Sequence, residues 1–379
     1  MKSELKNICD LINEKISANE LINNNLASTY VSTESMVPNK RGITKPSSIP
    51  SKGTTTAYKK DDVLVSNIRP YFKKIWSANY DGVCSNDVLV FRAKNTADAN
   101  FLYYVLANDD FFVYSMATSK GTKMPRGDKA SIMKYEVESF DLNTQRKIAS
   151  ILKPIDKKIE LNNAINNNLL QQLHVLYLRL FDDSAMDIPL GDVVATTSGG
   201  TPSRKHEEYY SNSSICWVKS KELLGNYIHE TEEHINDLAI KKSSAKLLPE
   251  HSVLIAMYGA TVGAYGVISK PMTCNQAVCA LLCNKNYPYT YLFQIAYESQ
   301  QKFINLAVGS AQQNISQVLI KQLNLHSDLD IIQRFHGLAL PMHQEIEFLQ
   351  AENIRLSDLR DNLLPKLMSG ELDVSNVEI

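Results

Sequence analysis

His229 and His234 come nearest to a metal site in this chain, but their spacing does not suit one. They flank three glutamates, as the histidines of a zinc-protease helix flank one, yet they lie five positions apart rather than four. Two side chains at that spacing do not share a helical face and would not hold one zinc ion from a single helix. The sequence therefore predicts no metal ligand in this segment.

Three further segments match catalytic motifs only in part. Residues 259–266 follow a predicted strand and hold three glycines, yet lack the Lys-Ser/Thr of a P-loop and the glycine spacing of a dinucleotide site. Residues 286–289 differ at their second position from the Asn-Pro-Pro-Tyr box of amino-methyltransferases, and no glycine-rich cofactor loop precedes them. Residues 154–158 carry nuclease-like charges that an amphipathic helix would leave solvated. Since no Ser/His/Asp or Cys/His set has a supporting motif, we predict no catalytic residue.

Charge is unevenly distributed along the chain, although the net charge is only −1. Residues 40–74 carry nine Lys/Arg against two acids, and residues 119–134 carry five against Asp128 alone. From residue 330 onward, four basic residues face nine acidic ones. The sequence thus predicts a local basic face and an acidic end, which the pooled charge conceals.

Composition indicates a globular protein of a reduced compartment. Six cysteines form no disulfide framework, and the spacing of Cys274, Cys279 and Cys283 does not suit zinc. No apolar stretch follows the first charged residues, so no signal peptide is expected. The longest uncharged runs, 252–269 and 303–320, are not apolar enough for a membrane helix. We expect a cytoplasmic protein without a membrane partner.

The chain contains an internal repeat. Residues 142–181 and 332–368 align at a shift of 187, which superposes Pro154 on Pro341 and Asn166 on Asn353. Between these segments, residues 63–65 match 253–255 and residues 84–86 match 274–276 at a shift of 190. Low identity elsewhere favours one scaffold with two divergent surfaces, although chance alignment of short strands is an alternative for the matches outside the helices.

Each copy of the repeat ends in a long amphipathic helix, and the two apolar stripes predict an antiparallel pair. Pro154 and Pro341 should start or kink these helices. Asn166 and Asn353 interrupt the stripes at equivalent places, either to fix the register or as partly exposed residues. The predicted seam of the helix pair comprises Ile148, Leu152, Ile155, Ile159, Asn166, Leu169, Leu173, Leu176, Leu180, Leu338, Met342, Ile346, Leu349, Asn353, Leu356, Leu363 and Leu367.

The fold class that we predict is α+β, with two globular mixed α/β domains separated by a pair of long antiparallel helices forming a coiled coil. Strands are predicted at 62–66, 87–91 and 253–258, with helices at 101–115 and 287–305. The predicted domains are residues 1–141 and 185–329, the central helix is 142–184, and the C-terminal helix and tail are 330–379.

Three segments together resemble the specificity (S) subunit of type I restriction-modification systems. They are Gln145–Glu160, Thr197–Val218 with the following Ser243–Gly259, and Leu363–Leu372, in the order and spacing of that family. The resemblance covers nearly the whole chain. The first domain departs from the pattern, because residues 12–17 stand where the second domain has its Thr-Ser-Gly-Gly-Thr-Pro loop. The role of that loop is therefore not carried over to the first domain.

The resemblance implies two target-recognition domains, each binding one half of a bipartite, asymmetric site in double-stranded DNA. It also implies that the helix pair sets the unread spacer and docks two methyltransferase subunits, with S-adenosylmethionine bound by those subunits and no cofactor bound by this chain. Motor-nuclease restriction subunits would complete the complex. The family's S subunit has no catalytic residue, in agreement with the motif search.

Under this interpretation, Lys and Arg supply salt-dependent affinity, and polar side chains recognise base edges. In the first domain the predicted DNA-binding residues are Lys40, Arg41, Lys45, Lys52, Lys59, Lys60, Arg69, Lys73, Lys74, Lys120, Lys123 and Arg126. In the second domain they are Ser198, Gly199, Thr201, Ser203, Arg204, Lys205, Lys219, Lys221, Tyr258, Thr261, Asn275, Gln276, Gln312, Gln313 and Asn314. Any single lysine could instead be a solvated surface residue, and the glycines could be plain turn residues.

A function of another class is also compatible with the sequence. The chain could be a coiled-coil assembly adaptor whose domains bind proteins rather than DNA, with incidental basic loops. A stand-alone nuclease or methyltransferase is a more distant alternative.

Overall fold

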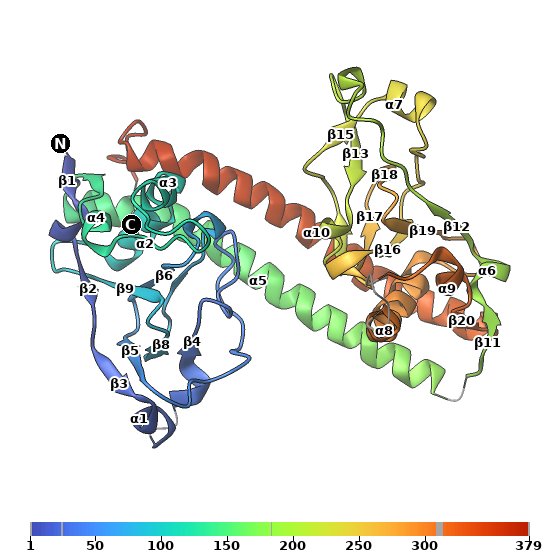
Figure 1. Cartoon of the computed structure of the whole chain (residues 1–379), viewed down its shortest axis with the longest axis horizontal. Coiled ribbons are helices and arrows are strands. Elements are labelled where there is room, and N and C mark those ends of the chain that lie inside the picture. The colour runs from blue at the N-terminus through green and yellow to red at the C-terminus, as the bar shows by residue number, and fades with distance from the viewer. Residues whose placement is uncertain (1, 24–25, 183, 308–313, 378–379) are drawn as a thin grey trace. The chain divides into compact units, whose positions relative to one another are not determined.

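The chain forms two compact units in a computed structural model that describes residues 2–23, 26–182, 184–307 and 314–377. Unit 1 comprises Met1–Ile159 and Leu356–Ile379, and unit 2 comprises Glu160–Arg355 (Figure 1). Two long helices, α5 (Leu142–Phe181) and α10 (Leu329–Met368), contribute to both units. Each unit combines small sheets with helices, as predicted. The domain boundaries at 141, 184 and 329 stay a prediction, since the compact units divide both long helices.

Unit 1 is built on two four-stranded sheets and one strand pair. The first sheet has the order β2-β9-β6-β7, the second β3-β5-β8-β4, and β1 pairs with β10. Their bounds are β1 Lys2–Glu4, β2 Cys9–Ile12, β3 Lys15–Ser17, β4 Tyr30–Val31, β5 Thr54–Tyr58, β6 Val63–Ser66, β7 Ile75–Ser77, β8 Gly82–Cys84, β9 Val88–Ala93 and β10 Glu136–Glu138. The predicted strands at 62–66 and 87–91 are confirmed as β6 and β9, whose valines and leucines are buried.

Two helices of unit 1, α2 and α3, pack aromatic side chains against the first sheet, and the unit has four short α-helices in its described residues. They are α1 Ala18–Asn23, α2 Ala99–Ala107, α3 Asp109–Ala117 and α4 Lys129–Ile132. The single helix predicted over 101–115 is wrong, because the chain breaks at Asn108. That residue ends α2 in an extended conformation, and its Oδ1 accepts the Asp110 N–H at 3.3 Å to cap α3. A short polar side chain competes in this way with the backbone bonds of a continuous helix.

The described residues of unit 2 also form two sheets and one strand pair, but its sheets have five and three strands. Its sheets have the orders β12-β19-β16-β17-β14 and β15-β13-β18, and β11 pairs with β20. The strands are β11 Met186–Pro189, β12 Ala195–Ser198, β13 Ile215–Val218, β14 Asn226–Ile228, β15 His234–Ile235, β16 Val253–Ala256, β17 Tyr265–Ile268, β18 Thr273–Cys274, β19 Val278–Leu282 and β20 Asn324–His326. The helices are α6 Leu190–Val193, α7 Asp237–Lys242, α8 Tyr289–Ala307 and α9 Gln317–Lys321. Thus the strand predicted at 253–258 and the helix predicted at 287–305 are confirmed.

Backbone pairing shows that the sequence repeat is a structural repeat. In unit 1, β4 and β8 are parallel with Val31 opposite Cys84, and in unit 2, β13 and β18 are parallel with Val218 opposite Cys274. The residue after each cysteine donates its N–H to the carbonyl of the opposed valine, at 2.8 Å and 2.9 Å. These four residues are the ones that the shifts of 187 and 190 superpose, so chance alignment is excluded there.

The long helices pair antiparallel within each unit. In unit 1, Ile148 and Leu152 share a core with Leu364 and Leu367 near the opposite end of the sequence of α10. In unit 2, Asn162 Nδ2 donates to Asn353 Oδ1 at 2.9 Å. The prediction that each proline could start its helix is wrong, because α5 and α10 begin at Leu142 and Leu329 and continue through both prolines.

Burial along the two helices supports the predicted seam at every position except one. Leu338 is 49% exposed, and its neighbour Ala339 is buried with Phe335 and Ile332. Each residue turns a helix by about 100°, so the buried face at this point lies one position later than the 4/3 spacing predicts. The other seam residues are buried or half-buried. Asn166 is buried, which disfavours the alternative of a partly exposed asparagine there, whereas Asn353 is partly exposed, as that alternative states.

The core of unit 2 contains a fully buried histidine, which makes its stability depend on pH. The imidazole of His343 contacts the Tyr227 hydroxyl at 2.8 Å and the ring of Phe293. Burial, reinforced by His336 and His251, lowers the pKa of His343 to about 3. In the unfolded chain, His343 therefore takes up a proton near the ordinary histidine pKa of about 6.5. In the folded chain, the imidazole stays neutral until the pH approaches 3. Unit 2 must lose stability as pH falls from about 6.5 towards 3.

Replacing His343 should flatten this dependence. Between pH 6.5 and pH 5, we expect His343→Gln to lose about 1 kcal/mol less stability per pH unit than the parent chain, in denaturant unfolding at each pH. His251, whose pKa is raised first by its hydrogen bond to Glu347, contributes the opposite slope in both chains. The exposed His206→Gln serves as the control. Parallel curves for His343→Gln and the parent would contradict the assignment.

Candidate nucleic-acid interface

In both units, the same loops meet where the central strand ends. In unit 1 the Asn67 N–H, just after β6, donates to Asp87 O at 2.8 Å, and Ile68 pairs with Arg126. In unit 2 the Met257 N–H, just after β16, donates to Ala277 O at 2.8 Å, and Tyr258 pairs with Asn314. We call this surface the loop edge. In unit 1 it comprises residues 32–34, 66–74, 84–87 and 119–126, and in unit 2 residues 219–221, 256–262, 274–277 and Asn314.

Several predicted cations of unit 1 gather at this loop edge although they are distant in sequence. The Lys40 N–H donates to Lys73 O at 2.9 Å, and the Arg69 N–H donates to Pro125 O at 2.8 Å. These bonds hold the loop around Lys40, the turn after β6 and the loop 119–126 against one another. The structure therefore brings Lys40, Arg69, Lys73, Lys74, Lys120, Lys123 and Arg126 to one edge of the unit.

Most of these cations are paired with acids. Lys40 and Lys73 both contact Asp109, at 2.8 Å and 2.7 Å, and the Lys40 side chain is only 8% exposed. Burial alone would raise the pKa of Asp109, but its hydrogen bonds from these two lysines lower it. Arg126 pairs with Asp87 at 3.1 Å and Lys120 with Asp128 at 2.6 Å. The loop edge is less positive than its count of Lys and Arg suggests.

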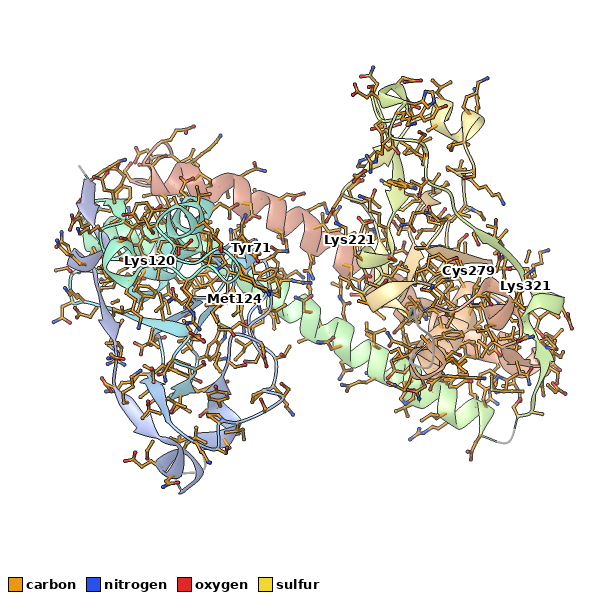
Figure 2. The ribbon with its side chains drawn as sticks, viewed as in Figure 1. Tyr71, Lys120, Met124, Lys221, Cys279 and Lys321 are labelled. Carbon is orange, nitrogen blue, oxygen red and sulfur yellow. The ribbon has the colours of Figure 1, made fainter. Side chains whose placement is uncertain are left out.

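A pocket of about 560 Å³ opens at the loop edge of unit 1. Its lining includes Tyr30, Thr33, Arg69, Phe72, Lys74 and Met124. Burial lowers the pKa of Lys74, and its Nζ donates to Thr33 O. Figure 2 labels Tyr71, Lys120 and Met124 among the side chains of unit 1. The pocket combines cationic, hydroxyl and apolar groups with the carboxylates of Glu34 and Asp87, and such a mixture of donors, acceptors and apolar surface is compatible with recognition of base edges.

Lys59 and Lys60 lie at the other end of β6 from this loop edge. The backbone N–H of Lys59 donates to Asp62 Oδ2 at 2.8 Å and that of Lys60 to Asp81 Oδ1 at 2.7 Å, before the start of β6. A strand of four residues places them about 13 Å from its other end. The basic residues over 40–74 are therefore not all gathered at the loop edge, and a single basic face stays a prediction. Arg41, Lys45 and Lys52 are exposed on the long loop between β4 and β5.

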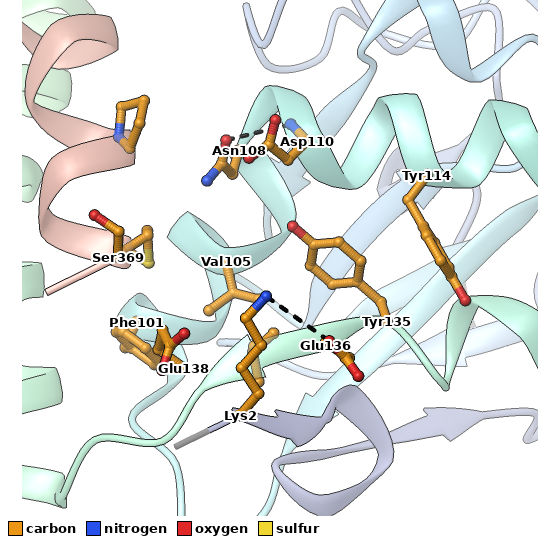
Figure 3. A pocket seen from close by; sticks show the side chains of 13 residues that line it. Lys2, Phe101, Val105, Asn108, Asp110, Tyr114, Tyr135, Glu136, Glu138 and Ser369 are labelled. Carbon is orange, nitrogen blue, oxygen red and sulfur yellow. Dashed lines mark hydrogen bonds and ion pairs between the residues drawn. The ribbon is translucent and has the colours of Figure 1, made fainter.

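None of the residues that line a second pocket of unit 1 is a predicted site residue (Figure 3). It has a volume of about 400 Å³ and is lined by Lys2, Phe101, Tyr114, Tyr135, Glu136 and Glu138 among others. Lys2 lies 3.8 Å from Glu136 across the β1–β10 pair. With three acids near one lysine, this pocket does not suit an anionic ligand.

In unit 2, neutral polar side chains dominate the loop edge. Tyr258, Thr261, Asn275 and Gln276 lie there, and Thr201 Oγ1 donates to Gln276 Oε1 from the neighbouring loop. Asn314 pairs with Tyr258, whereas the predicted Gln312 and Gln313 lie outside the described residues. Ser198 instead donates to Gln317 Oε1 at 3.1 Å. Ser203 and Lys205 are exposed on the loop after β12.

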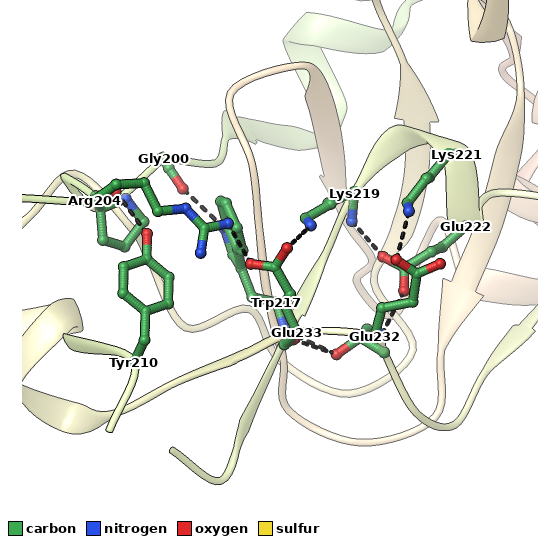
Figure 4. A network of polar contacts seen from close by, with 11 residues as sticks. Gly200, Arg204, Tyr210, Trp217, Lys219, Lys221, Glu222, Glu232 and Glu233 are labelled. Atoms are coloured by element: carbon green, nitrogen blue, oxygen red, sulfur yellow. Dashed lines mark hydrogen bonds and ion pairs between the residues drawn. The ribbon is translucent and has the colours of Figure 1, made fainter. Parts of the chain in front are cut away.

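The predicted cations of unit 2 form a network with glutamates (Figure 4). Arg204 and Lys219 both contact Glu233, and Lys221 contacts Glu232. The Arg204 guanidinium also lies 4.3 Å from the centre of the Tyr210 ring. The hydrogen bond from Lys219 lowers the pKa of Glu233, so this carboxylate stays charged and neutralises its partners. Phosphate binding by these cations would have to compete with the glutamates.

Gly199 and Gly200 serve packing. A Cβ atom on Gly199 would lie 2.0 Å from Cys274 O, and one on Gly200 would lie 2.4 Å from the Ser244 carbonyl carbon. The absence of a side chain lets β12 and its loop approach these backbones. Gly199 therefore packs against the backbone of the loop at 274–277. No observed geometry supports the DNA contact that was predicted for it.

Gly199→Ala should destabilise unit 2 by about 1–3 kcal/mol, because backbone atoms cannot yield to the added methyl group. The control is Gly337→Ala within α10, where nothing lies within 4 Å of the added Cβ. That change should stabilise the chain by up to about 1 kcal/mol through helix propensity. Denaturant unfolding of both variants provides the comparison. Equal changes in the free energy of unfolding for the two variants would show that β12 can shift to accommodate the added methyl group.

Among the described residues, one group has metal-like proximity. The ligand atoms of Cys216, Glu230 and His234 lie within 4.8 Å of one another. Glu230 already contacts His234 and Lys270, and the Cys216 thiol donates to it at 3.0 Å. The ammonium group of Lys270 beside the Glu230 carboxylate would repel a divalent cation at this position. His229 is not in this group.

Sequence reasoning missed the apolar members of the loop edge. Tyr71 and Phe72 are exposed in the turn after β6, with ring centres 4.7 Å apart, and Met124 is exposed on the facing loop. Their only sequence signal was an aromatic pair between Arg69 and Lys73.

Among the described residues, no helix is both long and apolar enough to cross a bilayer.

Comparison with known proteins gives a consistent result. The family model of the type I restriction modification DNA specificity domain matches residues 1–171 and 183–326. The type I restriction enzyme MjaIX specificity subunit of Methanocaldococcus jannaschii is 25% identical over 75% of this chain and 71% of its own length. The HindI specificity subunit of Haemophilus influenzae is 22% identical over 83% and 87%. The crystal structure of an S subunit from M. genitalium, 15% identical, superposes with a TM-score of 0.57 over 97% of this chain and 96% of that one.

Proposed function

The chain belongs to the type I restriction modification DNA specificity family, and from this premise we propose that each unit recognises one half of a bipartite, asymmetric DNA target. The repeated loop edge is the observation that supports this proposal. Unit 1 presents Arg69, Tyr71 and Phe72 after its central strand, and unit 2 presents Tyr258 and Thr261 at the equivalent place. One scaffold with two different surfaces suits two unlike half-sites.

The chemistry of the loop edge suits duplex DNA. Lysine and arginine side chains would contact phosphates, and the polar and aromatic groups beside them would contact base edges in the major groove. Since many of the cations are already paired with acids, we propose fewer phosphate contacts than the sequence count suggests. Affinity should still fall with salt, because each phosphate contact releases bound counterions.

The two long helices would set the distance between the half-sites. A helix of 40 residues spans about 60 Å. If the pair is rigid, the separation of the recognition surfaces becomes a property of the protein, and the spacer between half-sites goes unread.

The outer faces of the helices support docking of two methyltransferase subunits. Exposed apolar side chains occur along both of them: Leu161, Ile165, Val175, Leu178, Leu338, Phe348, Ile354 and Leu359. Such groups on otherwise polar helices favour a protein partner. We propose that those subunits bind S-adenosylmethionine and methylate adenine, that motor-nuclease subunits join them for restriction, and that this chain is a non-catalytic cytoplasmic component.

A salt titration of DNA binding tests the proposal against the adaptor alternative. The chain, purified with its methyltransferase subunit, should bind labelled duplex with an affinity that falls at least tenfold between 50 and 200 mM salt. The methyltransferase subunit alone is the control. Its salt titration separates its own contribution to DNA affinity from that of this chain. Binding that needs this chain but is independent of salt would favour the adaptor.

A further inference from the structure

The turn that follows β6 in unit 1 has an unusual backbone. Arg69 and Lys73 adopt left-handed conformations, with φ of 50° and 49°, on either side of Pro70–Phe72. Residues other than glycine rarely adopt this conformation, which clusters at functional sites when the surrounding structure enforces it. Here the Arg69 N–H is held by Pro125 O at 2.8 Å, and the Phe72 and Lys73 carbonyls accept from the loop at Asn39 and Lys40. The turn is fixed from both sides.

Arg69 differs from four of the cations around it, which are paired with acids. Lys40 and Lys73 share Asp109, Arg126 contacts Asp87, and Lys120 contacts Asp128. Among the described residues, no acid pairs with Arg69, whose Nε is shielded from solvent and has no hydrogen-bond partner. Its side chain lines the pocket at the loop edge. An arginine that no described acid neutralises, held in a fixed turn at a pocket, can offer its guanidinium to an external acceptor.

Aromatic side chains flank this arginine. Tyr71 is 49% exposed, and Phe72 and Met124 are also exposed. The Lys74 Nζ lies 5.7 Å from the centre of the Phe72 ring, which brings a cation onto one face of the aromatic pair. Apolar surface beside a cation suits the edge of a base pair better than the phosphate backbone, which offers only charge and polar oxygens.

We propose that Arg69 recognises a guanine in one half-site by donating to its O6 and N7 in the major groove, with Tyr71 and Phe72 packing on the adjacent base pair. This inference rests on the proposed function and assigns one position of the target to one side chain. The equivalent turn in unit 2, Gly259–Thr261, has no arginine. The other half-site is therefore recognised by different groups, among them the hydroxyls and amides of unit 2.

The test is the methylation profile of a randomised DNA library, read for complexes with the parent chain, Arg69→Ala or Arg69→Lys. Arg69→Ala should reduce discrimination at a single G·C position of one half-site by about 10- to 100-fold and leave the other half-site unchanged. Arg69→Lys should restore part of it, since lysine lacks the two-pronged geometry. The matched control is Arg146→Ala, an exposed arginine near the start of α5, which should leave every position unchanged.

The outcomes separate this inference from the function on which it rests. A parent chain that directs no bipartite methylation would overturn both. A bipartite motif that Arg69→Ala leaves unaltered, or weakens evenly at all positions, would overturn only the role of Arg69 in base recognition. If Arg69→Ala does not fold, as judged by circular dichroism, Tyr71→Ala provides the decision. It should relax the position beside that guanine, and an unchanged profile there would contradict the proposal.

Discussion

Inserting one heptad into each long helix should lengthen the spacer between the two methylated half-sites by one to three base pairs and leave both half-sites unchanged. Seven residues add about 10 Å of helix, and one base pair spans about 3.4 Å, so three is the value for helices parallel to the duplex axis. The insertions belong after Ile159 and after Arg355, where the two compact units divide. A heptad preserves the side-chain pattern of the seam. Sequencing of methylated DNA gives the spacer directly.

The matched control places the same heptad in α5 alone. That chain cannot keep Asp156 beside Arg360 and Asn162 beside Asn353 at the same time, because both pairs span the two helices. We expect it to lose specific methylation or to fold poorly. If instead the double insertion keeps the original spacer, the helices do not set the distance, and the spacer role is wrong.

Phe335→Ala should destabilise unit 2 by about 3–5 kcal/mol, whereas Phe348→Ala on the same helix should change its stability by less than about 0.5 kcal/mol. Phe335 is fully buried, with ring centres 6.1 Å from Tyr177 and 5.9 Å from Phe181 on α5. Phe348 is 55% exposed. The pair compares one residue type on one helix, so the difference reports the packing of α10 against α5.

Tryptophan fluorescence can report this difference for unit 2 alone. The chain has two tryptophans, Trp76 in unit 1 and Trp217 in unit 2. In a Trp76→Phe background, denaturant unfolding followed by Trp217 gives the stability of unit 2. Similar midpoints for the two alanine variants would mean that the helix pair adds little to that unit. A loss of methyltransferase binding by Phe348→Ala at full stability would support the docking role of the exposed face.

The sequence predicted the architecture well because periodicity and internal repetition report backbone structure directly. The stripes from Ile148 to Leu180 and from Met342 to Leu367 predicted the helix pair, and the match of Cys84 with Cys274 predicted equivalent strands. The misplacement of Leu338 and the unpredicted break at Asn108 have local causes. At Asn108, one polar side chain caps the next helix and breaks the regular pattern. Near Leu338, the buried face of α10 is shifted by one residue.

The candidate site was harder to predict because charge pairing depends on residues distant in sequence. Asp109, at the start of α3, neutralises Lys40 and Lys73 from two earlier loops, and Glu233, after β14, neutralises Arg204 and Lys219. A count of Lys and Arg along the chain predicts neither of these ion-pair networks. Likewise, the separation of Lys59 from Arg69 follows from the direction of β6, which a cluster defined by sequence distance ignores.

The most direct test of bipartite recognition is a map of methylated adenines made with and without this chain, using its methyltransferase partner and random DNA. The account predicts a motif that depends on the chain and consists of two unlike short half-sites at one fixed distance, with no preference between them. A contiguous motif, a variable distance, or the same methylation without the chain would contradict it.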